Sequence, residues 1–162
     1  MSAVMSQDSN ELSCVLIPAG AVQLLLPNVT VAEVLPWRRV KPVAEAPVWC
    51  LGLVGWRGES VPVIRHELLN GGGDETLRRT GRCLTIMNRA GSDDGVPFYA
   101  IATDRLPRLI HVSAAELELT SEAPNTADLL TVKVGADEAV VPNIALIENE
   151  LAKLKNLWID SG

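Results

Sequence analysis

The most informative segment of this chain reads Ala46-Pro-Val-Trp-Cys-Leu-Gly-Leu-Val-Gly-Trp-Arg-Gly-Glu-Ser-Val-Pro-Val-Ile-Arg65. Its two apolar runs, Val48–Val54 and Val61–Ile64, are joined by Gly55-Trp56-Arg57-Gly58. Apolar runs bounded by glycines predict strands, and a short glycine-containing connection between them predicts a hairpin. Trp and Arg are enriched at binding hot spots, whereas turns usually carry small polar residues. We interpret the tip as a recognition site; in the alternative interpretation, Trp56 folds back onto the core.

Similar short apolar runs, bounded by Gly, Pro, Asn or Asp, recur along the whole chain and predict an all-β protein. The predicted strands are Cys14–Ala19, Val22–Leu26, Cys50–Val54, Val61–Ile64, Cys83–Met87, Phe98–Thr103, Thr131–Val134 and Ala139–Val141. Thr30–Leu35 fits a strand or one helical turn, and Pro36 ends it in either case. Asn70-Gly-Gly-Gly-Asp74 is the natural break in mid-chain, and Ser92-Asp-Asp-Gly95 predicts a hairpin turn.

The last part of the chain has a different period. In Ile144–Asp160 the apolar side chains recur at helical spacing, with charged residues between them. Asn143 is placed to cap the first turn. The segment therefore predicts an amphipathic C-terminal helix that packs on its own barrel, with docking into a partner as the less favoured alternative.

A weak internal repeat relates the two halves of the chain. Val54-Gly55 and Val61-Pro62-x-Ile64 are echoed 80 residues later, and Cys14-Val-Leu-Ile17 is echoed by Cys83-Leu-Thr-Ile86. Each half shows strand, strand, a linking segment and a glycine-tipped hairpin in the same order. This order indicates two similar small barrels in tandem.

Composition and charge narrow the class of protein. The chain has 162 residues, is 48% hydrophobic and carries a net charge of −6, all of it within residues 109–162. Such a chain repels phosphate backbones, which disfavours general nucleic-acid binding. Cys14, Cys50 and Cys83 are widely spaced, as expected for buried thiols in a reducing compartment. Met1–Asn10 lacks the pattern of a signal peptide and no apolar run is long enough to span a bilayer, so we expect a cytoplasmic protein without membrane insertion.

The residues that usually carry catalysis are sparse. His66 and His111 lie far apart, away from every cysteine, and each is expected to be a surface or hydrogen-bonded residue. We expect no catalytic site, no metal site and no cofactor. A basic patch is instead predicted from Arg38, Arg39 and Lys41 together with the hairpin arginine, which suits an acidic protein partner. The alternative is a solvated loop with no partner.

The hairpin segment resembles the signature of the CheW-like adaptors of bacterial chemosensory arrays. That signature, Ala-Pro-x-x-x-x-Gly-x-x-Asn-Leu-Arg-Gly-x-x-x-Pro-Val/Ile-Val/Ile, matches Ala46–Ile64, and Val31-Ala-Glu-Val34 and Arg105–Leu119 resemble further family segments. The resemblance implies an all-β fold with a C-terminal helix, built of two five-stranded SH3-like barrels. We expect a disordered segment at 1–12 and a CheW-like domain at 13–162, made of interleaved subdomains at about 13–75 and 76–162.

The resemblance also implies a function. Proteins of this family are non-catalytic scaffolds that couple the cytoplasmic tips of methyl-accepting chemoreceptors to the regulatory domain of a CheA-type histidine kinase, and that contact other CheW-like domains. By position, it implies partner contacts at Val31, Gly52 and Arg57, with Glu33 as a weaker candidate; the hairpin tip adds Trp56 and Gly58.

This chain departs from the family pattern at several positions. Gly55-Trp56 replaces the usual Asn-Leu, and Arg65 replaces the usual Asp. These departures indicate a divergent, accessory adaptor of the type found with type IV pilus chemosensory systems. An alternative function is a small β-barrel module that binds single-stranded nucleic acid through Trp and Arg. An enzyme with an unrecognised site is the least favoured class.

Overall fold

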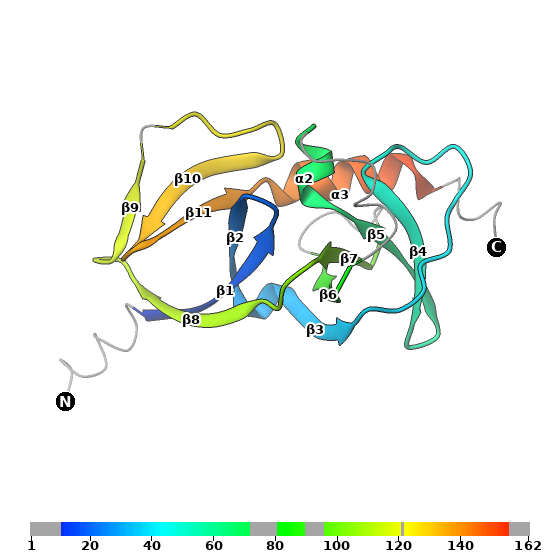
Figure 1. The fold of residues 1–162 in the computed structure, drawn as a ribbon, viewed down its shortest axis with the longest axis horizontal. Helices are drawn as coiled ribbons and strands as arrows, with labels where there is room; N and C mark the ends of the chain where they lie inside the picture. Colours follow the sequence, from blue (N-terminus) through cyan, green and yellow to red (C-terminus); the bar gives the residue numbers. More distant parts are fainter. Residues whose placement is uncertain (1–10, 72–80, 90–95, 121, 156–162) are drawn as a thin grey trace.

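The computed structural model describes residues 11–71, 81–89, 96–120 and 122–155. They form two sheets, which lie side by side in Figure 1. One sheet has the order β8-β1-β2-β11-β10-β9 and the other has the order β3-β6-β7-β5-β4. We call the first the interrupted barrel and the second the inserted barrel, because the chain leaves the first to build the second and then returns.

The elements of the interrupted barrel are β1 (Glu11–Ala19), β2 (Val22–Pro27), β8 (Arg108–Ser113), β9 (Leu117–Leu119), β10 (Asp128–Val134) and β11 (Asp137–Pro142). Those of the inserted barrel are β3 (Val31–Pro36), β4 (Cys50–Trp56), β5 (Glu59–Ile64), β6 (Cys83–Asn88) and β7 (Phe98–Thr103). A 3-10 turn, η1 (Asn28–Thr30), precedes β3, and a short helix, α2 (His66–Leu69), follows β5. The helix α3 (Ile144–Lys153) follows β11 and runs from the middle of the molecule along the upper side of the inserted barrel in Figure 1.

The eight predicted strands are confirmed, and the ambiguous segment at Thr30–Leu35 is a strand from Val31 onward, which includes Pro36. The sequence did not predict β8 and β9. In β8 exposed and partly buried residues mix without a clean alternation, and β9 has only three residues, all exposed. The predicted turn at Ser92–Gly95 lies outside the described residues.

The buried residues form three clusters in the described part of the chain, one inside each barrel and one between them. The cluster between the barrels takes Val15 and Ile17 from β1, Tyr99 and Ile101 from β7, and side chains from α3. Alternate residues of the same strands, such as Leu16 and Ala100, fill the barrel interiors. Because these strands are buried on both faces, their sequences are continuous apolar runs instead of alternating ones.

The two barrels share one strand pattern. In each, a hairpin (β10–β11 or β4–β5) joins a three-stranded unit through a parallel pair, β11 with β2 or β5 with β7. β1 therefore corresponds to β6, which agrees with the echo of Cys14–Ile17 in Cys83–Ile86. The echo at Val134–Ile144 holds for the hairpin but not residue by residue. Val61 pairs with Val54, whereas Val141 pairs with Leu130.

The expected boundary near residue 75 does not separate the barrels. The inserted barrel is continuous from β3 to β7, whereas the interrupted barrel combines β1 and β2 with β8 to β11. The halves of the repeat are thus not the halves of the molecule, because each half gives strands to both barrels. At the N-terminal end β1 already begins at Glu11, two residues before the expected start of the domain.

The C-terminal helix agrees with its prediction where it is described. The Asn143 side chain accepts a hydrogen bond of 3.1 Å from the Leu146 N–H, which is the predicted N-cap. Ile147 and Leu151 are fully buried in the cluster between the barrels. The helix therefore packs on its own molecule; the predicted continuation over residues 156–160 lies outside the described residues.

Candidate partner-binding surface

The β4–β5 hairpin turns through two residues, not four. β4 continues to Trp56, which pairs with Glu59, and only Arg57 and Gly58 form the turn. Both have positive φ, 48° and 79°, as a type I′ turn requires. Such a turn matches the right-handed twist of the flanking strands, so the apolar runs stay paired up to the tip.

Three predicted site residues meet at this tip. The Trp56 Nε1–H donates to Glu33 Oε1 at 3.1 Å, and the Arg57 guanidinium donates to the same oxygen at 3.2 Å. Glu33 lies on β3 and Trp56 on β4, the two edge strands of the inserted sheet. The carboxylate of Glu33 therefore links β3 to the tip of the β4–β5 hairpin through hydrogen bonds.

Trp56 is buried, which supports the alternative that it folds back onto the core. The residue is 5% exposed, and its indole packs edge-to-face on Phe98, with ring centroids 4.8 Å apart. Our interpretation of an exposed indole at the tip is corrected here, because Trp56 ends an inward-facing row of β4. The indole ring supports the exposed Arg57 side chain, because the Arg57 Cζ lies 4.8 Å from the ring centroid.

Arg57 and Gly58 remain on the surface. The Arg57 side chain is 69% exposed although it contacts Glu33 and Trp56. The guanidinium is therefore held in one place while most of its N–H groups face solvent. Val31, another predicted contact residue, begins β3 and is partly buried against the cluster between the barrels.

Gly52 is required inside the protein. Its φ is +139°, and a Cβ atom there would lie 2.0 Å from the Lys41 carbonyl oxygen. Lys41 approaches so closely because its N–H and C=O both pair with Leu53, each at 2.8 Å. At Gly52, where the family resemblance implies a partner contact, the close approach is made by the chain itself.

The predicted basic patch lies beside the same hairpin. Arg38 Nη1 donates to the Gly55 carbonyl at 2.9 Å, so its guanidinium is held against β4. Arg39 and Lys41 are exposed on the segment that leads from β3 to β4. Arg38 and Arg57 therefore flank Gly55, one fixed by a hydrogen bond and the other by the turn.

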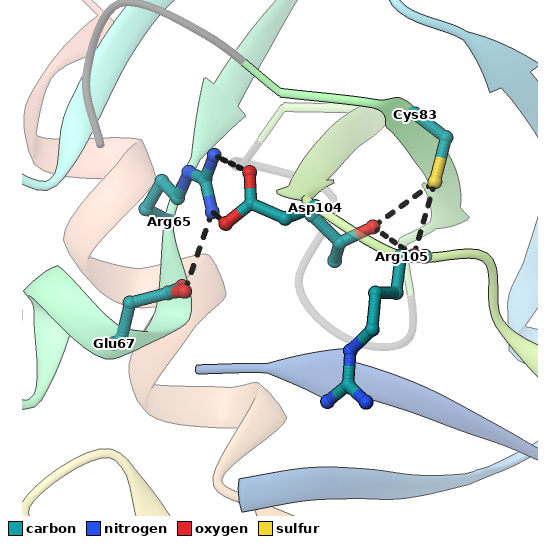
Figure 2. A network of polar contacts seen from close by, with 6 residues as sticks. Arg65, Glu67, Cys83, Asp104 and Arg105 are labelled. Atoms are coloured by element: carbon teal, nitrogen blue, oxygen red, sulfur yellow. Dashed lines mark hydrogen bonds and ion pairs between the residues drawn. The ribbon is translucent and has the colours of Figure 1, made fainter. Parts of the chain in front are cut away.

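A charged cluster around the buried Arg65 was missed by sequence reasoning. Arg65 is fully buried; its guanidinium contacts Asp104 at 2.8 and 3.1 Å and Glu67 at 3.3 Å (Figure 2). The hydrogen bond from Arg65 lowers the pKa of the Asp104 carboxyl. Asp104 lies between β7 and β8, so this ion pair pins the chain where it returns to the interrupted barrel. The signal that the sequence offered was the position of Arg65, a charged residue that directly follows the apolar strand β5.

A second buried cluster joins α2 to the start of β10. His66 Nε2 lies 2.6 Å from Asp128 Oδ1, and Asn70 donates to the other oxygen of Asp128 at 3.1 Å. Asn70 also accepts from the Ala127 N–H at 2.7 Å. His66 is thus the hydrogen-bonded histidine that we expected, and His111 is exposed near Ser13.

Other features of the described residues bear on the class of protein. The three cysteines are free and buried, as predicted, and burial raises the pKa of the Cys14 thiol. No group of three potential metal ligands occurs among the residues that the structure describes. Within the same residues, no helix is long and apolar enough to cross a membrane.

Comparison with known proteins places this architecture. The family model of the CheW-like domain matches residues 13–147. The crystal structure of the scaffolding protein TtCheW from Thermoanaerobacter tengcongensis superposes with a TM-score of 0.65 at 18% sequence identity, covering 81% of this chain and 88% of that chain. A search of curated proteins gave no match. The matched residues run from β1 into α3 and include both barrels and the hairpin, and the chain belongs to the CheW-like domain family.

Proposed function

We propose that this protein is a non-catalytic adaptor of a bacterial chemosensory array. It couples the cytoplasmic tips of methyl-accepting chemoreceptors to the regulatory domain of a CheA-type histidine kinase, and it works in the cytoplasm at receptor arrays. The observation that carries the proposal is the match of the CheW-like family model over residues 13–147. The fold shared with the scaffolding protein TtCheW supports it.

The arrangement at the hairpin supports a contact surface there. Arg57 is exposed yet braced by Glu33 and Trp56, so binding would order few additional side-chain rotamers. Gly58 adds exposed backbone without a side chain, whereas Val31 packs against the cluster between the barrels and Gly52 allows the close approach of Lys41. We propose the Arg57-Gly58 turn as the contact with the kinase or the receptor. Stacking of nucleobases is not favoured, because Trp56 is buried.

The finer role follows from the departures of this chain. Of the departing residues, Gly55 is exposed on the hairpin, so a partner that fits this surface differs from the usual one. We propose an accessory adaptor of a pilus-type chemosensory system, which also contacts other CheW-like domains.

Calorimetric titration against each partner tests the adaptor role. The full chain is mixed separately with the regulatory domain of the kinase and with the receptor tip encoded by the same genome, and each dissociation constant is measured by calorimetry. We expect micromolar or tighter binding to at least one of them. Failure to bind either partner at high micromolar concentration would contradict the adaptor role.

A further inference from the structure

Gly55 is a glycine that the fold itself does not need. A Cβ atom at this position would meet no heavy atom within 4 Å, and its φ is outside the positive range. Gly52 differs because of the close approach of Lys41, and Gly58 differs because of the turn. A glycine inside a strand weakens it, and often marks a place where another backbone or a ligand comes close. No contact within the fold therefore explains why position 55 is a glycine, and a contact with another molecule would explain it.

The position of Gly55 agrees with an external contact. Val54 and Trp56 are buried, so the alternation of the strand directs Gly55 to the outer face. Its cross-strand neighbour Ser60 is small and exposed. The result is a strip of bare backbone on the outer face of the β4–β5 hairpin.

The charges around this strip have one predominant sign. Arg38 is fixed on the Gly55 carbonyl, and Arg57 is fixed on Glu33 and Trp56. Arg39 and Lys41 add two exposed cations on the neighbouring segment, against the carboxylates of Glu33 and Glu59. Arg38 and Arg57 thus flank Gly55, and Arg39 and Lys41 extend the positive charge along the segment that leads to β4, in a protein whose net charge is −6.

We propose that Gly55 and its flanking arginines form a docking surface for an acidic segment of a partner protein. The segment lays its backbone on Gly55 and its carboxylates on Arg38 and Arg57, which offer planar donor pairs that suit carboxylates. The net negative charge of the molecule disfavours a nucleic-acid backbone on the same surface. The inference rests on the proposed function only in expecting the partner to be a protein.

Peptide binding tests the proposal without any kinase or receptor. Fluorescence anisotropy is measured at low salt with a labelled oligo-glutamate peptide, and with a labelled oligothymidylate of similar charge. The variants are Gly55→Leu, which fills the bare strip, and Arg38→Glu, which reverses one flanking charge. Arg105→Glu is the matched control, because Arg105 is an exposed arginine outside the surface. Thermal unfolding of each variant confirms that it is folded.

We expect the wild-type chain to bind oligo-glutamate more tightly than oligothymidylate. Gly55→Leu and Arg38→Glu should each weaken peptide binding about tenfold or more, while Arg105→Glu changes it less than twofold. Absence of peptide binding, or equal binding by the wild type and both folded variants, would overturn the proposal. Tighter binding of oligothymidylate that depends on Gly55 and Arg38 would also overturn it, in favour of a phosphate backbone. None of these outcomes decides whether the kinase or the receptor binds, so the adaptor role is tested separately.

Discussion

Gly52 and Gly55 lie on the same strand, β4, yet their surroundings differ completely. At Gly52 a side chain would collide with the backbone of Lys41 and would adopt an unfavourable φ, whereas at Gly55 there is open space. Replacing each glycine by alanine therefore distinguishes a glycine that the fold requires from one that it does not require.

We expect Gly52→Ala to lower the free energy of unfolding by about 3 kcal/mol or more, because the backbone of the 41–42 segment must move. Gly55→Ala should raise it by about 0.4–1 kcal/mol, because alanine restricts the unfolded chain without strain in the folded one. Urea denaturation followed by Trp fluorescence measures both. Equal effects of the two substitutions would show that the close approach at Gly52 is not rigid.

Arg57 combines a turn conformation with an exposed charge, and one substitution separates the two. Asn followed by Gly is the preferred pair for a type I′ turn, so Arg57→Asn should change the unfolding free energy by less than about 1 kcal/mol. The same variant removes the guanidinium and should weaken binding of the kinase domain or the receptor tip about tenfold. Calorimetric titration and thermal unfolding check the two parts. A large loss of stability with unchanged binding would mean that Arg57 only braces the barrel.

At the scale of elements, the ion pair of Arg65 and Asp104 should make stability depend on pH. The Asp104 pKa is lower in the folded state than the ordinary value of about 3.9. Its contribution is therefore present above the unfolded pKa and is lost as the pH falls through the folded one. Asp104→Asn should lower the unfolding free energy by about 1 kcal/mol at neutral pH, because Arg65 loses a charged partner whose side chain is 57% exposed and therefore partly screened by solvent.

Denaturation of wild type and Asp104→Asn across the acid range measures this dependence. The difference between them should shrink below about pH 4, because protonation removes the Asp104 charge from the wild type as well. A difference that stays constant down to the acid limit would assign the effect to shape instead of charge.

The N-cap of α3 offers a second test at this scale. Asn143 accepts from the Leu146 N–H, and α3 supplies Ile147 and Leu151 to the cluster between the barrels. Asn143→Ala should cost about 1 kcal/mol of unfolding free energy, whereas Asn143→Ser or Asn143→Asp should restore most of it. Loss of stability that neither replacement restores would indicate another role for the side chain.

Elements differ in how far the sequence predicts them. Apolar runs bounded by turn residues predicted β1, β2, β4–β7, β10 and β11, because burial on one or both faces leaves a clear pattern. β8 and β9 are mostly exposed, so neither period nor composition marks them. The contacts of Arg65 with Asp104 and of His66 with Asp128 join residues 39 and 62 positions apart. The sequence around each of these residues does not indicate which distant residue it will contact.

The candidate site was predicted unevenly for the same reason. The resemblance to a family named Glu33, Gly52 and Arg57, but the pattern of residues alone did not bring β3 next to β4. That proximity arises only from the curvature of the inserted sheet, which brings Glu33 on β3 within hydrogen-bond distance of Trp56 on β4. The burial of Trp56 likewise follows from the two-residue turn, which moves the indole from the tip into the strand.

At the scale of the whole molecule, the nesting of the barrels predicts how fragments behave. A cut near residue 75 falls within the inserted barrel and also separates β1 and β2 from β8 to β11. We expect fragments 1–75 and 76–162 to be unfolded alone and to regain β structure when mixed. Circular dichroism of each fragment and of the mixture measures this. A fragment that folds cooperatively by itself would contradict the exchange of strands between the halves.

The nesting also places two chain connections between the barrels, η1 at Asn28–Thr30 and the segment 104–107. A pair of domains joined by a single linker can swing open, whereas two short tethers remove most of that freedom. Here the tether at 104–107 is anchored by Arg65, and Asn88 donates to the Val29 carbonyl at 3.2 Å on the other. We therefore expect the two barrels to move as one body and not to swing apart, because both connections are short and hydrogen-bonded.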